Sequence, residues 1–272
     1  MQSFIAAAIQ MTSGDDMAAN IAALEPLIAE AVAKDARVVM TPENTFYMRR
    51  EGTAAMADVP MVEHPGVRYA AAAAKQHGIW LLIGSIRALE AGMAKPFNRS
   101  MLISPQGEIT ATYDKLHLFD VTLPDGHSYR ESSQAMAGDV PVVTDMDGMK
   151  LGMSICYDVR FPNLYRTLAL RGAEILSVPS AFTRPTGAAH WHTLLKARAI
   201  ENACYVIAPA QCGRHPGGRE TYGHSLMIDP WGEVVAEASA DQPQVITAVI
   251  DQARVAQVRA QIPVLTHHRI ID

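Results

Sequence analysis

Short apolar segments alternate with helix-like segments along the whole chain, and this alternation limits its fold more than any other feature. Strand-like apolar runs lie at Phe4–Met11, Arg37–Met40 and Ile79–Ser85, and segments with helical spacing separate them. Pro105–Gln106–Gly107 and Asp147–Gly148 are hairpin signals, so antiparallel pairs are mixed in. We therefore expect an α/β fold with two packed sheets or one large sheet, covered by helices.

The same signals predict the remaining elements. Helices are expected at 17–31 (with Asp15 as its cap), 66–77, 160–171, 190–202 and 251–259, and further strands at 97–104, 108–113, 140–144, 150–155, 174–178, 204–210 and 245–250. Residues 120–139 are rich in Asp, Gly, Ser and Pro, which indicates a long functional or lid loop. Residues 181–189 are expected to form a polar loop, and residues 211–218 a Gly-rich loop.

The composition favours one domain and argues against nucleic-acid binding. The chain has 272 residues, of which 49% are apolar, which is enough for a large core. Because it contains no repeat, linker or low-complexity tract, we expect a single domain over residues 1–272. A formal charge of −5 and the absence of a Lys/Arg cluster predict neither a nucleic-acid partner nor an anionic membrane surface.

The segments that usually direct export are also not evident. The first residues lack a positive region followed by a long apolar one, and no apolar run approaches the length of a membrane span. The three cysteines, Cys156, Cys204 and Cys212, are odd in number and widely spaced. This pattern indicates a reducing cytoplasm and no disulfide framework.

A cysteine follows directly on a buried strand in the stretch Gly152–Pro162. The apolar run ends just before Cys156, and a helix-like segment begins a few residues later. A cysteine on such a turn exposes its thiol and has backbone N–H groups beside it, which suits a nucleophile that generates an oxyanion. A buried structural cysteine is the plainer alternative for a single Cys.

Two charged residues also follow shortly after predicted strands, as Cys156 does. Glu43 follows the strand that ends at Met40, and Lys115 follows the strand that ends at Tyr113. Each could be an ordinary surface charge, but the carboxyl ends of neighbouring strands converge in layered α/β folds. A carboxylate, an ammonium and a thiol together supply a base, an oxyanion partner and a nucleophile for acyl transfer.

These residues carry a resemblance to the nitrilase (carbon–nitrogen hydrolase) superfamily over essentially the full length. The matching motifs are Pro42–Glu43, Tyr113–Phe119 and Cys156–Pro162. The resemblance implies an αββα four-layer sandwich that dimerises or forms a higher homo-oligomer, and a catalytic set of Glu43, Lys115 and Cys156. It further implies that Glu131 orients Lys115 and the substrate amide, and that the Tyr157 N–H completes the oxyanion hole. It implies neither a cofactor nor a metal.

The residues after the cysteine resemble the amidase branches rather than the true nitrilases, which tend to have Trp–Glu where this chain has Tyr157–Asp158. Residues 210–227 resemble the branch that hydrolyses deaminated glutathione to 2-oxoglutarate and cysteinylglycine. The alternative is an ω-amidase acting on 2-oxoglutaramate, or an amidase for another small linear amide or N-carbamoyl compound. A non-catalytic scaffold and a thiol redox sensor are less favoured.

For several further residues the sequence leaves more than one role open. Arg160 is expected either to bind a substrate carboxylate or to pair with Asp158. Phe182 and Thr186 are candidates for the lining of the acyl pocket.

Three histidines, a cysteine and a tyrosine complete the set of residues whose roles the sequence leaves open. His190 and His192 lie two apart on a predicted helix and so point to different faces, without an acidic partner at metal spacing, so no metal is expected there. Cys212 could approach the pocket or have no role. Tyr222 and His224 could shape the leaving-group side.

Overall fold

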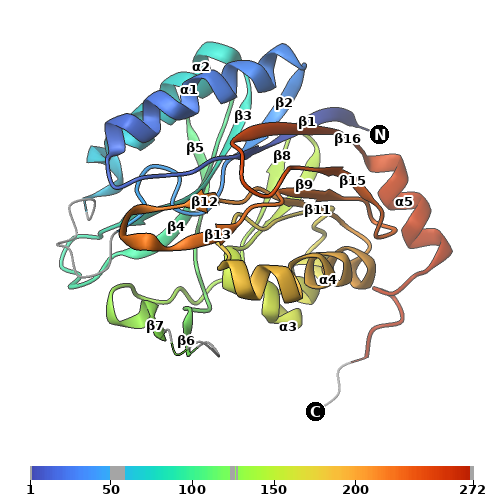
Figure 1. Cartoon of the computed structure of the whole chain (residues 1–272). Coiled ribbons are helices and arrows are strands. Elements are labelled where there is room, and N and C mark those ends of the chain that lie inside the picture. Colours follow the sequence, from blue (N-terminus) through green and yellow to red (C-terminus); the bar gives the residue numbers. More distant parts are fainter. Residues whose placement is uncertain (1, 50–58, 123–125, 127, 270–272) are drawn as a thin grey trace.

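The computed structural model describes residues 2–49, 59–122, 126 and 128–269, and these form four layers. Helices α1 (Met17–Ala33) and α2 (Pro65–His77) cover the outer face of one six-stranded sheet (Figure 1). Helices α3 (Pro162–Leu170) and α4 (Arg184–Asn202) cover the outer face of a second six-stranded sheet. The chain therefore folds as the αββα sandwich that the resemblance implied.

The first sheet has a parallel centre and antiparallel edges, in the order β16-β1-β2-β3-β4-β5. Its strands are β1 (Ser3–Gln10), β2 (Ala36–Met40), β3 (Trp80–Ala88), β4 (Phe97–Ile103), β5 (Ile109–Asp114) and β16 (Gln244–Asp251). The pairs β1–β2 and β2–β3 are parallel, whereas β3–β4 and β4–β5 are antiparallel. Strand β5 thus runs in the same direction as β2, and both end at the same edge of the sheet.

The second sheet repeats this plan, in the order β15-β14-β11-β10-β9-β8. Its strands are β8 (Val143–Met146), β9 (Met149–Met153), β10 (Ile175–Ser177), β11 (Tyr205–Ala208), β14 (Leu226–Ile228) and β15 (Val234–Glu237). Strands β9, β10 and β11 are parallel to one another. Strands β8 and β14 flank them and run antiparallel to them, and β15 pairs antiparallel with β14.

Short elements surround the two sheets. Two hairpins pair β6 (Asp120–Thr122) with β7 (Ser128–Arg130) and β12 (Cys212–Arg214) with β13 (Glu220–Tyr222). The 3-10 helices are η1 (Met61–Glu63), η2 (Glu131–Ser133), η3 (Cys156–Arg160) and η4 (Pro216–Gly218), and α5 (Gln252–Gln261) follows β16.

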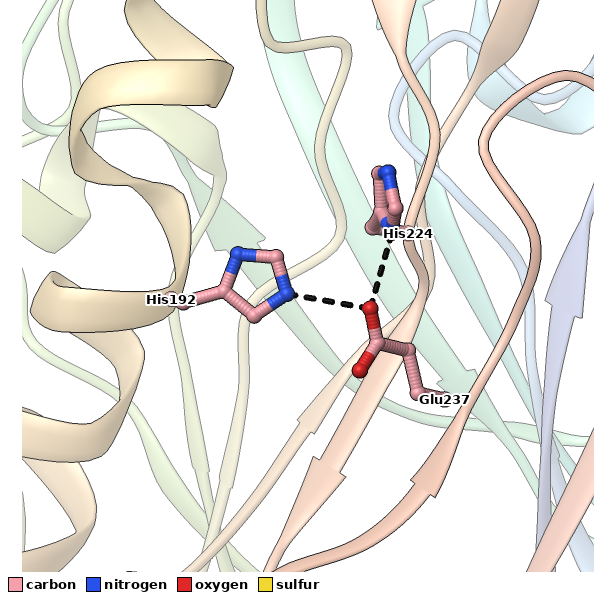
Figure 2. A group of neighbouring side chains, drawn as sticks. All are labelled: His192, His224 and Glu237. Carbon is pink, nitrogen blue, oxygen red and sulfur yellow. Dashed lines mark hydrogen bonds and ion pairs between the residues drawn. The ribbon is translucent and has the colours of Figure 1, made fainter.

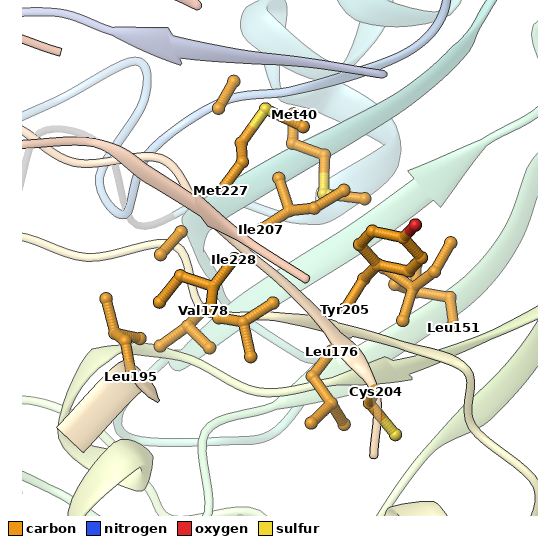
Figure 3. Packing of buried hydrophobic residues seen from close by; sticks show 14 of the residues in the cluster. Met40, Leu151, Leu176, Val178, Leu195, Cys204, Tyr205, Ile207, Met227 and Ile228 are labelled. Carbon is orange, nitrogen blue, oxygen red and sulfur yellow. The ribbon is translucent and has the colours of Figure 1, made fainter. Parts of the chain in front are cut away.

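The period-two alternation of strand residues divides the core into two clusters. On β1, Ala7 and Ile9 face the cluster with α1 and α2. Ala6 and Ala8 face the second cluster, which fills the space between the sheets and continues to α3 and α4. Figure 3 shows the second cluster, where Met40 of β2 lies near Met227 of β14. Because both faces of the central strands are buried, these strands are almost continuously apolar.

Three local predictions were wrong. Residues 211–218, predicted as a Gly-rich loop, contain β12 and η4, because β12 pairs with β13. The N-cap of α1 is Asp16 rather than Asp15, since the Asp16 Oδ1 accepts hydrogen bonds from Ala18 and Ala19 N–H. Helix α4 begins at Arg184, so most of the predicted polar loop at 181–189 is helical. Its first turn contains a proline, which is compatible with a helix start because no N–H is needed there.

A glycine in that first part of α4 allows a close contact. A Cβ atom at Gly187 would lie 2.3 Å from the Cβ of Tyr222, so only glycine lets the helix pack on β13 at this distance.

The predicted long loop at 120–139 contains β6, β7 and η2, and residues 123–125 and 127 of it lie outside the described residues. Among the helices described, none is both long and apolar enough to cross a membrane.

Candidate active site

The ends of three strands bring Glu43, Lys115 and Cys156 together at one edge of the sandwich. Glu43 follows β2, Lys115 follows β5, and Cys156 follows β9 of the other sheet. All three are buried, with exposed fractions of 4%, 1% and 7%. They line a common cavity, so the convergence expected from the strand directions is present.

Lys115 is a buried ammonium held between two carboxylates. Its Nζ donates to Glu43 Oε1 at 2.8 Å, and to Glu131 Oε2 at 2.9 Å and Oε1 at 3.2 Å. Glu131 Oε2 also accepts a hydrogen bond from the Phe119 N–H at 2.7 Å. An ammonium at this depth requires such partners, because removing a charge from water costs several kcal/mol.

Glu43 is oriented by groups from both sheets. Its Oε2 accepts a hydrogen bond from the backbone N–H of Ala181 at 2.9 Å, on the segment after β10. Its Oε1 accepts a second bond, from Asn98 Nδ2 at 2.9 Å. The same Asn98 amide donates to Glu131 Oε1 at 2.9 Å, so one side chain fixes both carboxylates.

The backbone at Cys156 is strained, as expected for the sharp turn that the sequence predicted at this residue. Its φ is 49°, in the left-handed region that non-glycine residues rarely adopt. The N–H of Cys156 donates to Pro179 O at 2.9 Å, which holds the turn against the second sheet. Tyr157 is the second residue of η3, and N–H groups at a helix start have no intrahelical acceptor. The Tyr157 N–H is therefore available as an oxyanion donor.

Asp158 connects the cysteine turn to the lysine loop. Its Oδ2 accepts hydrogen bonds from the Tyr113 hydroxyl at 2.7 Å and from the Ile155 N–H at 2.9 Å. Its Oδ1 accepts one from the His117 N–H at 3.1 Å. The fully buried carboxylate of Asp158 thus links Tyr113 and His117, which flank Lys115, to Ile155, which precedes Cys156.

The charges in the site keep the thiol protonated at rest. Burial, followed by the negative charge of Glu43, raises the pKa of Cys156 above its ordinary value, and Lys115 opposes this only in part. Burial alone would raise the pKa of Glu43, but Lys115, together with Cys156 and Arg219, brings it below its usual value. Burial would likewise lower the pKa of Lys115, yet Glu131 and Glu43 raise it well above its usual value.

The resting state is therefore a thiol, a carboxylate and an ammonium. A protonated Cys156 cannot act as the low-pKa thiolate that a redox sensor needs. Glu43 is ionised and beside the thiol, so it can accept the proton as attack begins.

The cavity has a volume of about 390 Å³, within the range of small-molecule sites. Its walls include Glu131, Tyr157, Phe182 and Thr186 as well as the three strand-end residues. Sequence reasoning did not predict its arginines, which are Arg49, Arg87, Arg130 and Arg219.

Arg219 is the arginine whose position is most informative. Its Nη2 donates to Ala181 O at 2.8 Å, and its guanidinium lies 5.6 Å from the centre of the Tyr129 ring. Its Nε is buried and has no hydrogen-bond partner among the described residues. Only its position after the Gly-rich loop, amid other polar residues, distinguished it in the sequence.

Asn98 was also missed, although a signal existed. It is a buried amide near the start of β4, and a buried polar group needs hydrogen-bond partners. Its partners, Glu43 and Glu131, are too distant in sequence for the pattern to identify them.

Other residues considered from the sequence lie outside the cavity wall. Arg160 is 3.3 Å from His190 Nδ1 and lies over the rings of Tyr157 and Phe182, at 5.9 and 5.4 Å from their centres. The cavity-lining residues in the described part of the chain do not include Arg160. Its expected ion pair with Asp158 does not occur among the described contacts, where Asp158 binds the groups given above.

Cys212, Tyr222 and His224 do not line the cavity either, within the described residues. Cys212 is buried, with its Sγ 3.3 Å from the Thr12 hydroxyl.

Known proteins are similar to this chain in sequence and in fold. The family model described as carbon-nitrogen hydrolase matches residues 5–260. The deaminated glutathione amidase of Synechocystis is 44% identical over 270 residues, covering 98% of each chain. That of Yersinia enterocolitica is 37% identical over 268 residues, covering 98% of this chain and 93% of its own. A Saccharomyces cerevisiae structure, a member of branch 10 of the nitrilase superfamily, superposes with a TM-score of 0.87 at 29% identity, covering 96% of this chain and 95% of that chain.

We expect the Cys156 thiol to stay protonated well into the alkaline range, because burial and Glu43 raise its pKa. Infrared difference spectra between the wild type and Cys156→Ala isolate its S–H stretching band. The band should persist at about pH 9.5, above the ordinary thiol pKa of about 8.5. Glu43→Gln removes a raising charge, so its band should vanish at lower pH than in the wild type. Loss of the wild-type band near pH 8.5 would contradict this assignment.

Proposed function

The chain belongs to the carbon-nitrogen hydrolase family and is an amidase for C–N bonds other than peptide bonds, and from this premise we propose that it hydrolyses deaminated glutathione. The products are 2-oxoglutarate and cysteinylglycine, so the enzyme removes a damaged metabolite. The relatives from Synechocystis and Yersinia carry the name of this activity.

The positive charge of the cavity wall is the observation that best supports this choice of substrate. Among the described lining residues, Lys115, Arg130 and Arg219 are cations, and Glu43 and Glu131 are carboxylates. Deaminated glutathione has a carboxylate at each end, one on the 2-oxo acid and one on the glycine. A positive surplus in a concave site favours such a dianion over a singly charged or neutral amide.

In the proposed first half-reaction, Cys156 attacks the amide carbonyl while Glu43 accepts the thiol proton. The carbonyl oxygen becomes an oxyanion, which the Lys115 ammonium and the Tyr157 N–H stabilise. Glu43 then transfers the proton to the amide nitrogen, the C–N bond breaks, and cysteinylglycine leaves with a neutral amine. A thioester links the 2-oxoglutaryl group to Cys156.

In the second half-reaction, Glu43 takes a proton from water, and the resulting hydroxide attacks the thioester carbonyl. The same oxyanion donors act again, the C–S bond breaks, and the thiol regains its proton from Glu43. Glu131 acts through Lys115, since its two hydrogen bonds hold the ammonium in place. Phe182 and Thr186 contribute to the wall against which the substrate lies.

We also propose that the enzyme acts in the cytoplasm as a homodimer or a higher homo-oligomer. All three cysteines are free and buried, which suits a reducing compartment. Leu170 on α3 and Ile200 on α4 are about half exposed, at 50% and 52%, so the outer helical layer has apolar surface for self-association. Sedimentation velocity measures the mass of the assembly.

Substitutions in the proposed catalytic set should remove activity without unfolding the chain. We expect Cys156→Ala to abolish turnover, and Glu43→Gln and Lys115→Ala each to lower kcat by a factor of about 100 to 10,000. Circular dichroism should show folded protein for Glu43→Gln, which keeps the shape of the side chain. Rapidly quenched wild-type enzyme should carry the acyl mass on Cys156. Full activity in any of the three variants would refute the mechanism.

The substrate can be tested directly by steady-state kinetics. We expect kcat/KM for deaminated glutathione to exceed that for 2-oxoglutaramate by more than about tenfold, which corresponds to about 1.4 kcal/mol in the barrier. The physical reason is that 2-oxoglutaramate has one carboxylate for the cationic wall instead of two. A preference for 2-oxoglutaramate would instead identify an ω-amidase.

Arg219 should contribute to binding of a substrate carboxylate. A charge-assisted hydrogen bond is worth about 1.5–3 kcal/mol, so Arg219→Gln should lower kcat/KM for deaminated glutathione about ten- to a hundredfold. Arg184→Gln is a matched control, because Arg184 is exposed and pairs with Glu220 and Asp241. Equal kinetics of the Arg219 variant and the wild type would exclude this role.

A further inference from the structure

Two histidines and a glutamate from three separate segments meet on the opposite side of α4 from His190. His192 lies on α4, His224 lies between β13 and β14, and Glu237 ends β15 (Figure 2). Glu237 Oε1 lies 3.0 Å from His192 Nε2 and 2.8 Å from His224 Nδ1. The ligand atoms of all three residues lie within 4.8 Å of one another, which is true of no other such group in the described part of the chain.

We propose that His192, His224 and Glu237 bind a divalent transition-metal ion, with Zn²⁺ as the best match. Two imidazole nitrogens and one carboxylate oxygen form a donor set that zinc uses in proteins. Tetrahedral zinc with bonds of about 2.0–2.1 Å places its ligand atoms about 3.3 Å apart. The two distances to Glu237 are a few tenths of an ångström shorter, so small side-chain shifts admit the ion.

The backbone around this cluster is held in position. The Trp191 indole N–H donates to His224 O at 2.7 Å, which ties α4 to the segment that carries the second histidine. The ring of Tyr222 lies 4.5 Å from that of His224 and limits its rotation. His224 also has a φ of 53°, a conformation that the surrounding contacts must maintain.

The cluster is open to solvent on one side. The exposed fractions of the side chains are 35% for His192, 24% for His224 and 38% for Glu237. Water can therefore reach the ion and complete a fourth position. None of the three residues lines the cavity described above, so the site is distinct from the amidase centre.

Binding would join α4 to β15 at the edge of the second sheet. An ion that binds the folded chain and not the unfolded one raises the stability of the fold. The site therefore also predicts a rise in Tm on addition of zinc.

The experiment is a titration of the full-length chain with zinc chloride against a chromophoric chelator. Cys156→Ala serves as the parent, so that the thiol of the amidase site does not compete. We expect one zinc per chain with a dissociation constant in the micromolar range or tighter, and a higher Tm with zinc. His192→Ala and Glu237→Gln, each added to the parent, should weaken binding at least about tenfold and lose most of the Tm rise.

Two matched variants control for surface effects. His190→Ala removes a histidine two residues from His192, and Glu233→Gln removes an exposed carboxylate just before β15. Both should bind zinc as the parent does. The proposal is overturned if the parent binds no zinc, or if His192→Ala and Glu237→Gln bind it as tightly as the parent. Circular dichroism of the zinc-free variants shows whether each is folded before titration.

Discussion

The buried ammonium of Lys115 is the constraint on which the site depends. A charge at that depth is tolerated only when opposite charges and hydrogen bonds surround it. Glu43 and Glu131 supply these, and Asn98 donates to both carboxylates. Glu43 in turn accepts a hydrogen bond from the segment after β10, so the ion network also joins the two sheets. The geometry of the site is thus coupled to the packing of the sandwich.

The same network sets the protonation states that the chemistry requires. A carboxylate beside a buried thiol raises the thiol pKa, so no thiolate is exposed at rest. In the proposed mechanism, the nucleophile forms only as Glu43 takes the proton, when a carbonyl is in place to receive the sulfur. The proposed oxyanion donors lie on the cysteine turn and on Lys115, and need little rearrangement. Around this centre, Arg130 and Arg219 add positive charge to the cavity wall, which the proposed dianionic substrate requires.

Most of the fold followed from periodicity, because apolar spacing reports directly which faces are buried. The errors have local causes. Asp15 and Asp16 are both able to cap α1, and only the backbone direction selects Asp16. The start of α4 is polar and contains Pro and Gly, so its composition resembles a loop; packing of Gly187 against Tyr222 stabilises it as helix. Tertiary contacts decide such segments because the intrinsic helix propensities of residues other than proline differ by only about 1 kcal/mol per residue or less.

The sequence by itself determined which residues could form a reacting centre, since Glu43, Lys115 and Cys156 each follow a predicted strand and strand ends converge. It could not determine Asn98 and Arg219 as members of the site, because their partners are remote in sequence. His192 seemed to lack an acidic neighbour for the same reason, and Glu237 reaches it only across the sheet edge. Strand ends are positioned by backbone hydrogen bonds, which local sequence encodes. Contacts between side chains of distant segments depend on how the layers pack, and only the tertiary structure decided them.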